Sequence, residues 1–408
     1  MISFEEAQKI VLDQTIELEA VETELLNALG LILAEDIVSP EKIPPFDNSA
    51  MDGFAVVAGD TAAASSETPA HLIVLEDEPA GTVSTKRVTS GTAVRIMTGA
   101  PIPKGADAVV KVEDTEGSRD LIEVLHPVEE GENVRRAGED VGLGETVLRK
   151  GALLGPAEIG LLASLGKSRV KVFRPAKAAI ITTGDELLEI DQPLVPGKIR
   201  NSNAYALEAQ VREIHAEPVG LGIVEDTKEA VTARIREGLE KADVVLTTGG
   251  VSVGEYDVVK DVMTSMGASL KFWKVAQKPG KPLAFWTLKG KLVFGLPGNP
   301  VASMVCFEEY VRPSIRKMMG HQKLFRPETE AILREDIKKK PGRLHFVRVK
   351  LESEDGQQYY VSSTGPQGSG ILKSMALADG LALVPVEVSL IRAGERIKVH
   401  LIGMPEDH

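Results

Sequence analysis

The sequence predicts a multidomain protein of the α/β plus β class, in which a three-layer α/β domain is combined with all-β parts. Between Ala176 and Met319, apolar runs of strand type alternate with runs of helical periodicity. This alternation is typical of a mostly parallel sheet that is covered by helices on both faces. The regions from Asp52 to about Glu145 and after Pro327 contain only short strand-type runs separated by Gly and Pro, which predicts an elongated all-β module and a C-terminal β-barrel-like domain.

The composition limits the classes of function. The length of 408 residues suggests roughly three domains, and the net charge of -13 argues against sequence-independent nucleic-acid binding, which needs clustered Lys and Arg. Cys306 is the only cysteine, so no intrachain disulfide or Cys-rich zinc site can form. Glu5 and Glu6 stand where a signal peptide carries positive charge, and Glu158 interrupts the longest apolar stretch. We therefore expect a cytoplasmic protein with no membrane span and no nucleic-acid partner.

The chain is predicted to begin with an amphipathic helix. Its apolar positions are Phe4, Ala7, Ile10, Val11 and Ile16. This spacing predicts a helix with one buried face from Met1 to about Glu24, opened by a capping box of Ser3 and Glu6 and followed by a second helical stretch to Gly30.

Strands and helices are predicted at the following positions. The all-β module has strands at 71–75, 93–97 and 108–112. The α/β region has strands at 178–182, 218–224, 244–247 and 291–294 and helices at 204–214, 227–241, 258–266 and 301–319. The C-terminal region has strands at 331–333, 344–351, 359–362, 380–384 and 397–401.

Polar loops follow three of the strands predicted in the α/β region, at residues 182–187, 247–257 and 295–300. Because the carboxyl ends of parallel strands meet at one edge of a sheet, we expect these loops to form one pocket. In the third loop, Asn299 is predicted as the N-cap of a helix that begins at Pro300, whose free N–H groups would suit a phosphate. Good helix capping without a ligand is the alternative.

The second loop is the most informative stretch of the chain. A buried strand leads into the small residues Thr248, Gly249, Gly250 and Ser252, which let backbone N–H groups approach phosphate oxygens. Asp257, at the start of the next helix, could hold a divalent cation against those oxygens. An ordinary glycine turn is the alternative.

Basic residues gather in one part of this acidic sequence. Lys271, Lys274, Lys278 and Lys281 lie within eleven positions, and prolines stiffen the segment that holds the last two. Several lysines near one site would suit an oxyanion such as phosphate or molybdate. The alternative is a basic hairpin edge that discourages strand pairing.

Carboxylates stand in several polar loops, namely Asp52, Asp140, Glu186, Asp226 and Asp257. If they converge in space they could hold Mg²⁺, which prefers oxygen ligands, and otherwise each is a turn or cap residue. The histidines form no close metal-ligand pair, and neither Ser nor Cys306 stands in a nucleophile motif, so covalent hydrolase chemistry is not expected.

Five motifs together carry a resemblance to a known family. They are Pro-Phe-Asp-Asn-Ser-Ala-Met-Asp-Gly at 45–53, Met-Thr-Gly-Ala-Pro at 97–101, Thr-Thr-Gly-Gly at 247–250, Lys-Pro-Gly-Lys-Pro at 278–282 and Gly-Leu-Pro-Gly-Asn-Pro at 295–300. In this order they resemble the molybdopterin molybdenumtransferases, the MoeA family of molybdenum cofactor biosynthesis, which includes the gephyrin E domain. The resemblance covers nearly the whole chain.

Membership of that family implies a transferase that inserts molybdate into adenylylated molybdopterin with the help of Mg²⁺, releasing AMP and molybdenum cofactor. It implies a homodimer whose upstream partner is molybdopterin adenylyltransferase, with a cleft completed by the β module of the other subunit. The implied domains are an α/β molybdopterin-binding domain (1–22 and 172–322), a linking domain (23–44 and 143–171), a β module (45–142) and a C-terminal β-barrel-like domain (323–408).

The resemblance also implies roles for individual residues. Catalytic roles fall to Asp52, Thr98, Asp140, Glu186, Asp226, Asp257, Lys274 and Lys278, with Glu186 and Asp257 as metal ligands. Substrate-binding roles fall to Arg135, Thr248, Gly249, Gly250, Ser252, Lys281, Pro297, Gly298, Asn299, Arg348 and Ser369. For the oxyanion, Arg343 and Ser374 are alternatives to Arg348 and Ser369, and so is a site formed by Lys278 with Lys281.

Two other functions are compatible with parts of the sequence. The α/β domain alone also resembles molybdopterin adenylyltransferase, but adenylylation would leave the β module and the C-terminal domain without a use. A gephyrin-like dimeric scaffold is the other alternative, although nothing in the sequence requires it.

We expect Asp257→Ala to abolish molybdate-dependent AMP release while the protein stays folded, because the carboxylate would hold the cation that offsets charge on the phosphates. AMP is measured after mixing the variant with adenylylated molybdopterin, Mg²⁺ and molybdate. Release at the wild-type rate would refute the role.

Overall fold

A computed structural model describes residues 1–249, 258–353 and 358–403. The chain forms two compact units. The first consists of Met1–Ala34, Leu153–Gly155 and Val170–His408, and the second of Glu35–Ala152 and Pro156–Arg169. The finer division into four domains stays a prediction. None of the helices among the described residues is long and apolar enough to cross a membrane.

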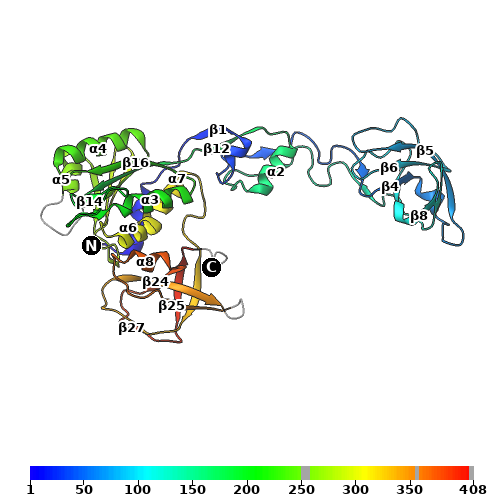
Figure 1. Cartoon of the computed structure of the whole chain (residues 1–408). Coiled ribbons are helices and arrows are strands. Elements are labelled where there is room, and N and C mark those ends of the chain that lie inside the picture. Colours follow the sequence, from blue (N-terminus) through cyan, green and yellow to red (C-terminus); the bar gives the residue numbers. More distant parts are fainter. Residues whose placement is uncertain (250–257, 354–357, 404–408) are drawn as a thin grey trace. The chain divides into compact units, whose positions relative to one another are not determined.

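A six-stranded sheet forms the centre of the first unit (Figure 1). Its strand order is β16 (Glu217–Val224), β13 (Lys177–Thr183), β17 (Val244–Thr248), β21 (Lys291–Leu296), β20 (Ala284–Leu288) and β18 (Ser269–Trp273). The first four strands are parallel, and β20 is antiparallel to both of its neighbours. The predicted mostly parallel sheet is thus confirmed, but β18 and β20 were not predicted.

Helices cover both faces of this sheet, which makes the three predicted layers (Figure 1). One face packs on α4 (Lys228–Lys241) and α5 (Val258–Ser265). The other face packs on α1 (Phe4–Asp13), α3 (Ser202–Glu213), α6 (Pro300–Cys306), the π-helical turn η4 (Phe307–Val311) and α7 (Arg312–Met318). Along β13, Ile180 enters one core and Ile181 the other, because successive side chains of a strand point to opposite faces.

The predicted helix to Glu24 is wrong in length, whereas the second helical stretch is present as a short 3₁₀ turn. The first helix begins as predicted, since Ser3 Oγ accepts a hydrogen bond from the Glu6 N–H, but it ends at Asp13. The chain then forms β1 (Ala20–Glu24), which pairs with β12 (Arg169–Phe173), and a short 3₁₀ turn, η1 (Leu25–Ala28). Ile16 is 66 % exposed, so it does not extend the buried stripe of the helix.

The C-terminal part forms a closed β-barrel, as predicted. Its strands are β22 (Glu328–Leu333), β24 (Leu344–Ser353), β25 (Tyr359–Ser363), β26 (Gly380–Val384) and β28 (Arg396–Leu401), and pairing of β24 with β26 closes the ring. The helix α8 (Leu372–Ala376) and the short pair β23 (Ile337–Lys338) and β27 (Leu390–Ile391) accompany it. The short strand β19 (Gln277–Lys278) extends from the α/β part and pairs with β24. Backbone hydrogen bonds therefore tie the barrel to the sheet domain.

The second unit contains a mixed six-stranded sheet, as expected for an all-β module. Its order is β7 (Ala108–Lys111), β4 (Gly53–Val56), β6 (Thr92–Ile96), β5 (Ala70–Glu78), β9 (Leu121–Val124) and β8 (Thr115–Gly117). The unit also contains two short strand pairs, β2 (Ile37–Val38) with β11 (Thr146–Leu148) and β3 (Asn48–Ser49) with β10 (Val134–Arg135). One α-helix, α2 (Pro156–Ser164), and two 3₁₀ turns, η2 (Ala58–Thr61) and η3 (Val112–Asp114), complete it.

Two buried carboxylates in the π-helical turn η4 hold the barrel against the α/β domain. Glu308 accepts a hydrogen bond from Arg326, which precedes the first barrel strand, at 2.8 Å. The next residue, Glu309, bonds His400 on β28 at 2.9 Å, and the other His400 nitrogen lies 3.6 Å from Glu328. Burial opposes protonation of His400, but the hydrogen bonds and negative charges of Glu309 and Glu328 outweigh this effect and raise the pKa of His400.

We expect His400→Gln to destabilise the protein by about 1.5–3 kcal/mol at about pH 6, because it removes a buried hydrogen bond between charged groups. A raised folded-state pKa means that this contribution is fully present below the ordinary histidine pKa and is lost as the pH rises through the folded value. The difference in unfolding free energy between wild type and variant should therefore shrink as the pH rises from about 6.5 through the raised folded-state pKa of His400. Urea unfolding measures it. The exposed His126 supplies the control, His126→Gln, and a pH-independent difference for His400→Gln would contradict the account.

Candidate functional site

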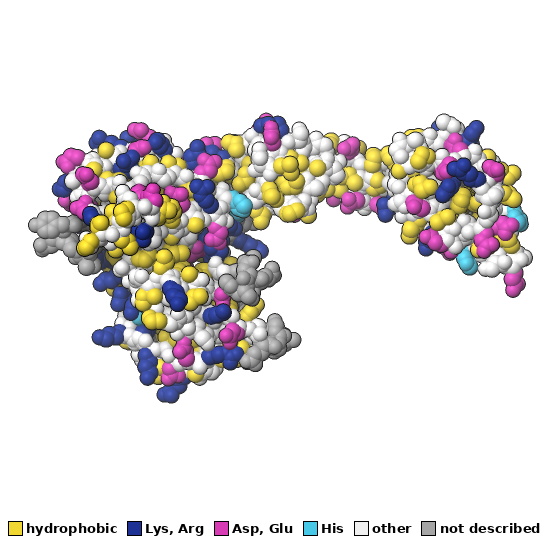
Figure 2. Space-filling model, viewed as in Figure 1, with side chains coloured by type: hydrophobic (Ala, Val, Ile, Leu, Met, Phe, Trp, Pro, Cys, Tyr) yellow, Lys and Arg dark blue, Asp and Glu magenta, His cyan; other side chains and the backbone are white. Residues whose placement is uncertain are grey.

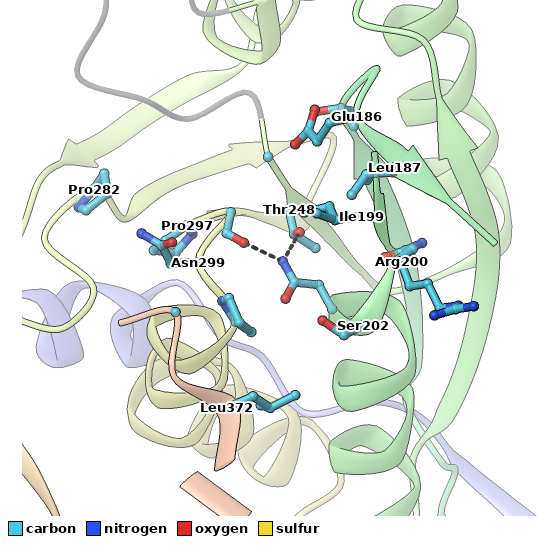
Figure 3. Close-up of a pocket in the computed structure, with 17 residues that line it drawn as sticks. Glu186, Leu187, Ile199, Arg200, Ser202, Thr248, Pro282, Pro297, Asn299 and Leu372 are labelled. Atoms are coloured by element: carbon cyan, nitrogen blue, oxygen red, sulfur yellow. Dashed lines mark hydrogen bonds between the residues drawn. The ribbon is translucent and has the colours of Figure 1, made fainter. Parts of the chain in front are cut away.

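A cavity of about 690 Å³ lies at the carboxyl ends of the parallel strands (Figure 3). Residues from the ends of β13, β17 and β21 line it, together with the start of α3 and, from the barrel side, Gly370 and Leu372. The predicted site residues among them are Glu186, Thr248, Gly249, Pro297, Gly298 and Asn299. The structure therefore brings the three predicted loops together, whereas Gly250, Ser252 and Asp257 lie outside the described residues.

Close approach of the backbones at these strand ends depends on glycine. Gly249 has a φ of +87°, and a Cβ atom there would lie 2.1 Å from the carbonyl oxygen of Thr183. A Cβ atom on Gly298 would lie 3.7 Å from the Gly249 Cα, so the third loop lies directly against the second. Because Gly249 is in contact with the end of β13, a larger residue would push the loops apart.

Two asparagines that were not predicted as site residues connect these loops. Asn203 Nδ2 donates to Thr248 Oγ1 and to the carbonyl oxygen of Gly298, both at 2.8 Å, and Figure 3 draws these two bonds. Asn201 Nδ2 donates to Thr182 Oγ1 at 2.8 Å, and its Oδ1 caps α3 by accepting from the Ala204 N–H. The signal in the sequence is Asn-Ser-Asn at the start of a helix, which predicts an N-cap at Asn201 but does not reveal the contacts across the sheet edge.

The helix α6 offers fewer free N–H groups than predicted. Asn299 is its N-cap and Pro300 its first residue, as expected. However, the Val301 N–H already donates to the carbonyl oxygen of Ser369 at 3.1 Å. The prediction of a free phosphate cradle at this helix start is therefore wrong for Val301, because the barrel-side loop occupies that donor.

Part of the predicted set of carboxylates converges. Burial raises the pKa of Asp226, and the neighbouring charges of Asp185 and Glu186 raise it further, so these groups share one region beyond β13 and β16. Glu186 lines the cavity, and its carboxylate folds over Gly184, where a Cβ atom would lie only 2.6 Å from Oε2. Among the described residues no three His, Cys, Asp or Glu side chains are arranged to hold a metal ion.

A second cavity of about 450 Å³ has a net positive lining, because five Lys and Arg residues line it against two acidic residues, Glu335 and Asp336. Its basic lining residues are Lys278, Lys338, Lys339, Lys340, Arg343 and His345. Burial and the positive charges of Lys339, Lys278 and Arg343 lower the pKa of His345 to about 4, which reflects a positive potential. Figure 2 shows Lys and Arg side chains along the left and lower edges of the part that holds the barrel, with Asp and Glu side chains among them. Lys278 thus belongs to a basic cluster that also contains barrel residues, which the sequence pattern did not show.

The two cavities are connected by short chain segments. Lys278 and Pro279 line the second cavity while Pro282 lines the first. Likewise Gln367 lines the second and Gly370 the first. Lys281 lies on one of these segments, whereas Lys274 follows β18, and within the described chain neither lines either of these two cavities. Along both segments, only a few residues of the chain separate the basic cavity from the main cavity.

Arg348 is a buried cation without an acidic partner among the described residues. Its Nε donates to Ser374 Oγ at 2.9 Å, and Nη2 donates to the carbonyl oxygens of Pro366 and Gly368. Its Nη1 atom has no partner in the described part of the chain, and burial lowers its pKa. Of the two serines considered from sequence, Ser374 contacts Arg348, whereas Ser369 contacts α6 through its carbonyl oxygen.

The remaining predicted residues belong to the second unit. The carboxylate of Asp52 accepts hydrogen bonds from the Thr98 N–H at 2.7 Å and the Thr98 hydroxyl at 2.8 Å, and these bonds lower the pKa of this exposed group. Arg135 lies on β10 and Asp140 follows it in a loop, both with exposed side chains. Their participation in the cleft stays a prediction.

The fold and the site define an α/β protein with a ligand cavity at the strand ends, closed on one side by a β-barrel. Family models match residues 2–166 as the MoeA N-terminal region (domain I and II), 179–317 as a probable molybdopterin binding domain and 330–402 as the MoeA C-terminal region (domain IV). The chain belongs to the MoeA family.

Relatives match it over nearly the full length. Molybdopterin molybdenumtransferase 2 of Mycobacterium tuberculosis (strain CDC 1551 / Oshkosh) is 38% identical over 98% of this chain and 99% of its own. The molybdopterin molybdenumtransferase of Haemophilus influenzae is 38% identical over 99% of this chain and 100% of its own. A crystal structure of the molybdopterin biosynthesis moeA protein from Pyrococcus horikoshii OT3 covers 98% of this chain and 100% of its own, with 34% identity and a TM-score of 0.83.

We expect Gly249→Ala to destabilise the protein by more than about 2 kcal/mol and to impair ligand binding, because the new Cβ atom would clash with the Thr183 carbonyl. Gly290→Ala is the matched control, since Gly290 also has a positive φ (+78°) but nothing lies within 4 Å of its added Cβ. Urea unfolding of both variants separates the clash from the backbone strain. Equal destabilisation would show that the close approach is unimportant.

Proposed function

We propose that this protein inserts molybdate into adenylylated molybdopterin, releasing AMP and molybdenum cofactor. The observation that carries this proposal is the match of the whole chain to molybdopterin molybdenumtransferases. The combination of a strand-end cavity with an adjacent basic cavity gives a physical reason for it. Transfer of molybdate to molybdopterin follows from the family, while adenylylation of the substrate and release of AMP are the finer part of the proposal.

The protein does not need to supply a sulfur nucleophile for this reaction. The dithiolate that receives molybdenum belongs to the pterin, and Cys306 is fully buried with a pKa raised well above its ordinary value. Catalysis then consists of positioning the two substrates and stabilising charge. This division of labour agrees with a chain that has one cysteine.

The main cavity would hold the organic substrate, and the basic cavity would collect the oxyanion. About 690 Å³ is within the usual range for a small-molecule site. Lys278 and the basic barrel residues would attract a dianion. The segments 278–282 and 367–370, which have residues in both cavities, would form the route from the basic cavity to the pterin. Because Arg348 is fully buried, it would act through its charge behind the 366–368 loop and not as a direct ligand. This arrangement favours the Lys278 alternative for the oxyanion.

Mg²⁺ would be held by carboxylates, with Glu186 and Asp257 as the proposed ligands and Asp226 nearby. The influence of the Asp185 and Glu186 charges on the pKa of Asp226 supports this, since like charges in one region are stabilised by a cation. All of these donors are oxygens, as Mg²⁺ prefers. When bound, the ion would neutralise charge on the phosphates.

A cytoplasmic homodimer that receives its substrate from molybdopterin adenylyltransferase is the proposed assembly. The first unit exposes Leu26 (79 %), Leu29 (51 %) and Leu153 (54 %), and the segments that carry the last two pair with each other. Such an apolar group favours an interface. The Asp52–Thr98 pair would then complete the cleft of the other subunit.

Lining of the main cavity by barrel residues favours this function over molybdopterin adenylylation, for which a barrel is not needed. The decisive experiment mixes the protein with adenylylated molybdopterin, Mg²⁺ and molybdate and measures AMP, with omission of molybdate as control. Light scattering of the same sample gives the assembly. Absence of molybdate-dependent AMP, or formation of adenylylated molybdopterin from ATP, would overturn the proposal.

We expect Lys278→Ala to weaken molybdate binding roughly 5- to 10-fold, because it removes one charge-assisted contact of about 1 kcal/mol from a partly exposed site. Lys350→Ala is the control, because Lys350 is exposed on the barrel strand β24 and lines neither cavity within the described residues. Calorimetric titration with molybdate compares the two, and Lys281→Ala decides whether that lysine shares the site. Identical affinities for Lys278→Ala and wild type would exclude Lys278 as an oxyanion contact.

A further inference from the structure

The orientation of the Asn203 side-chain amide is fixed by its neighbours. Its Nδ2 donates to the Gly298 carbonyl oxygen, which can only accept, so the amide cannot be flipped there. The second Nδ2 hydrogen is used by Thr248 Oγ1. Both donors of the amide are thus consumed by the protein. Asn203 Oδ1 has no partner among the described residues, and this residue lines the main cavity.

Because Asn203 Oδ1 can only accept a hydrogen bond, the ligand group that binds it at the cavity wall must be a hydrogen-bond donor. The oxygens of a phosphate bridged on both sides, as in adenylylated molybdopterin, and those of molybdate carry no proton at neutral pH, so they cannot donate to an amide oxygen and are repelled by its dipole. A heterocyclic amino or ring N–H group satisfies it. We propose that Asn203 Oδ1 recognises an amino or N–H group on a heterocycle of the organic substrate, a specificity role that rests on the proposed function.

The neighbouring hydroxyl has the opposite character. Thr248 Oγ1 accepts from Asn203, which leaves its own proton for an acceptor, and within the described residues no acceptor for it is found. The wall therefore presents an acceptor, Asn203 Oδ1, next to a donor, Thr248 Oγ1. A ligand with its ring at Asn203 and an acceptor atom towards Thr248 and Gly249 fits this polarity, whereas the reverse orientation leaves both groups unsatisfied.

The substrate contains two heterocycles with an amino group, adenine and the pterin. Both carry the donor that Asn203 requires, so the same chemistry has two possible sources. Adenosine monophosphate and purine riboside 5′-monophosphate form a matched pair that differs only in the adenine amino group. Molybdopterin probes the pterin separately.

Asn203 also ties two loops together, and Asn203→Ala removes those bonds as well. If the role of Asn203 is purely structural, Asn203→Ala lowers the affinity for every ligand by the same factor. If Asn203 recognises a donor, the variant lowers the affinity only for the ligand that carries that donor. The measured quantity is therefore the ratio of affinities between matched ligands, not the affinity of one. Tyr205→Ala is the control variant, because Tyr205 lies on the same helix, is 47 % exposed and is not among the described residues that line the cavity.

Calorimetry measures both nucleotides and molybdopterin with wild type, Asn203→Ala and Tyr205→Ala. If adenine meets Asn203, wild type prefers AMP over purine riboside 5′-monophosphate by about 5- to 10-fold, and Asn203→Ala loses this preference. If the pterin contacts Asn203, the affinity of Asn203→Ala for molybdopterin is lower than that of wild type by the same factor, and its affinities for both nucleotides are unchanged. Either result supports the proposal.

The proposal is overturned if Asn203→Ala lowers the affinities for all three ligands by the same factor, or if it changes none of these affinities. The assay for molybdate-dependent AMP release with wild type is run alongside. Its failure would remove the proposed function while the ratio of nucleotide affinities would still report on Asn203, so the two proposals fail independently.

Discussion

The close approach of three strand ends is the constraint on which the rest of the structure depends. Gly249 lies against the Thr183 carbonyl with a backbone conformation that favours glycine, and Gly298 lies against Gly249. This contact brings the end of β17 and the loop after β21 within reach of one side chain, Asn203. The cavity has polar walls of defined orientation because the backbone cannot spread at this point. Catalytic groups on mobile loops would not be held in one fixed orientation.

Attachment of the barrel completes the site. The ladder between β19 and β24 fixes Lys278 next to His345, and the Val301 N–H bond to the Ser369 carbonyl fixes the barrel-side loop over α6. The same loop contributes Gly370 to the main cavity and Gln367 to the basic one. A barrel held by Glu308 and Glu309 is thus a wall of the site and not an appended module.

Sequence reasoning succeeded where local pattern and fold agree. The buried strands of the parallel sheet, the Ser3 cap and the Asn299 cap are local signals, and the structure contains all of them. The helix predicted beyond Asp13 failed because pairing of β1 with β12 is a contact between distant segments. The role of Asn203 and the loss of the Val301 donor escaped prediction for the same reason, since both depend on which carbonyl oxygen comes near in three dimensions.

The burial of Arg348 has a consequence for how the protein behaves outside its reaction. A guanidinium surrounded by neutral oxygens in a low-dielectric interior carries an uncompensated self-energy. Multivalent anions bound in the neighbouring basic cavity would lower that energy in the native state alone. They therefore shift the folding equilibrium by mass action. The melting temperature of this enzyme should depend on the choice of buffer, being higher in phosphate or sulfate than in chloride of equal ionic strength.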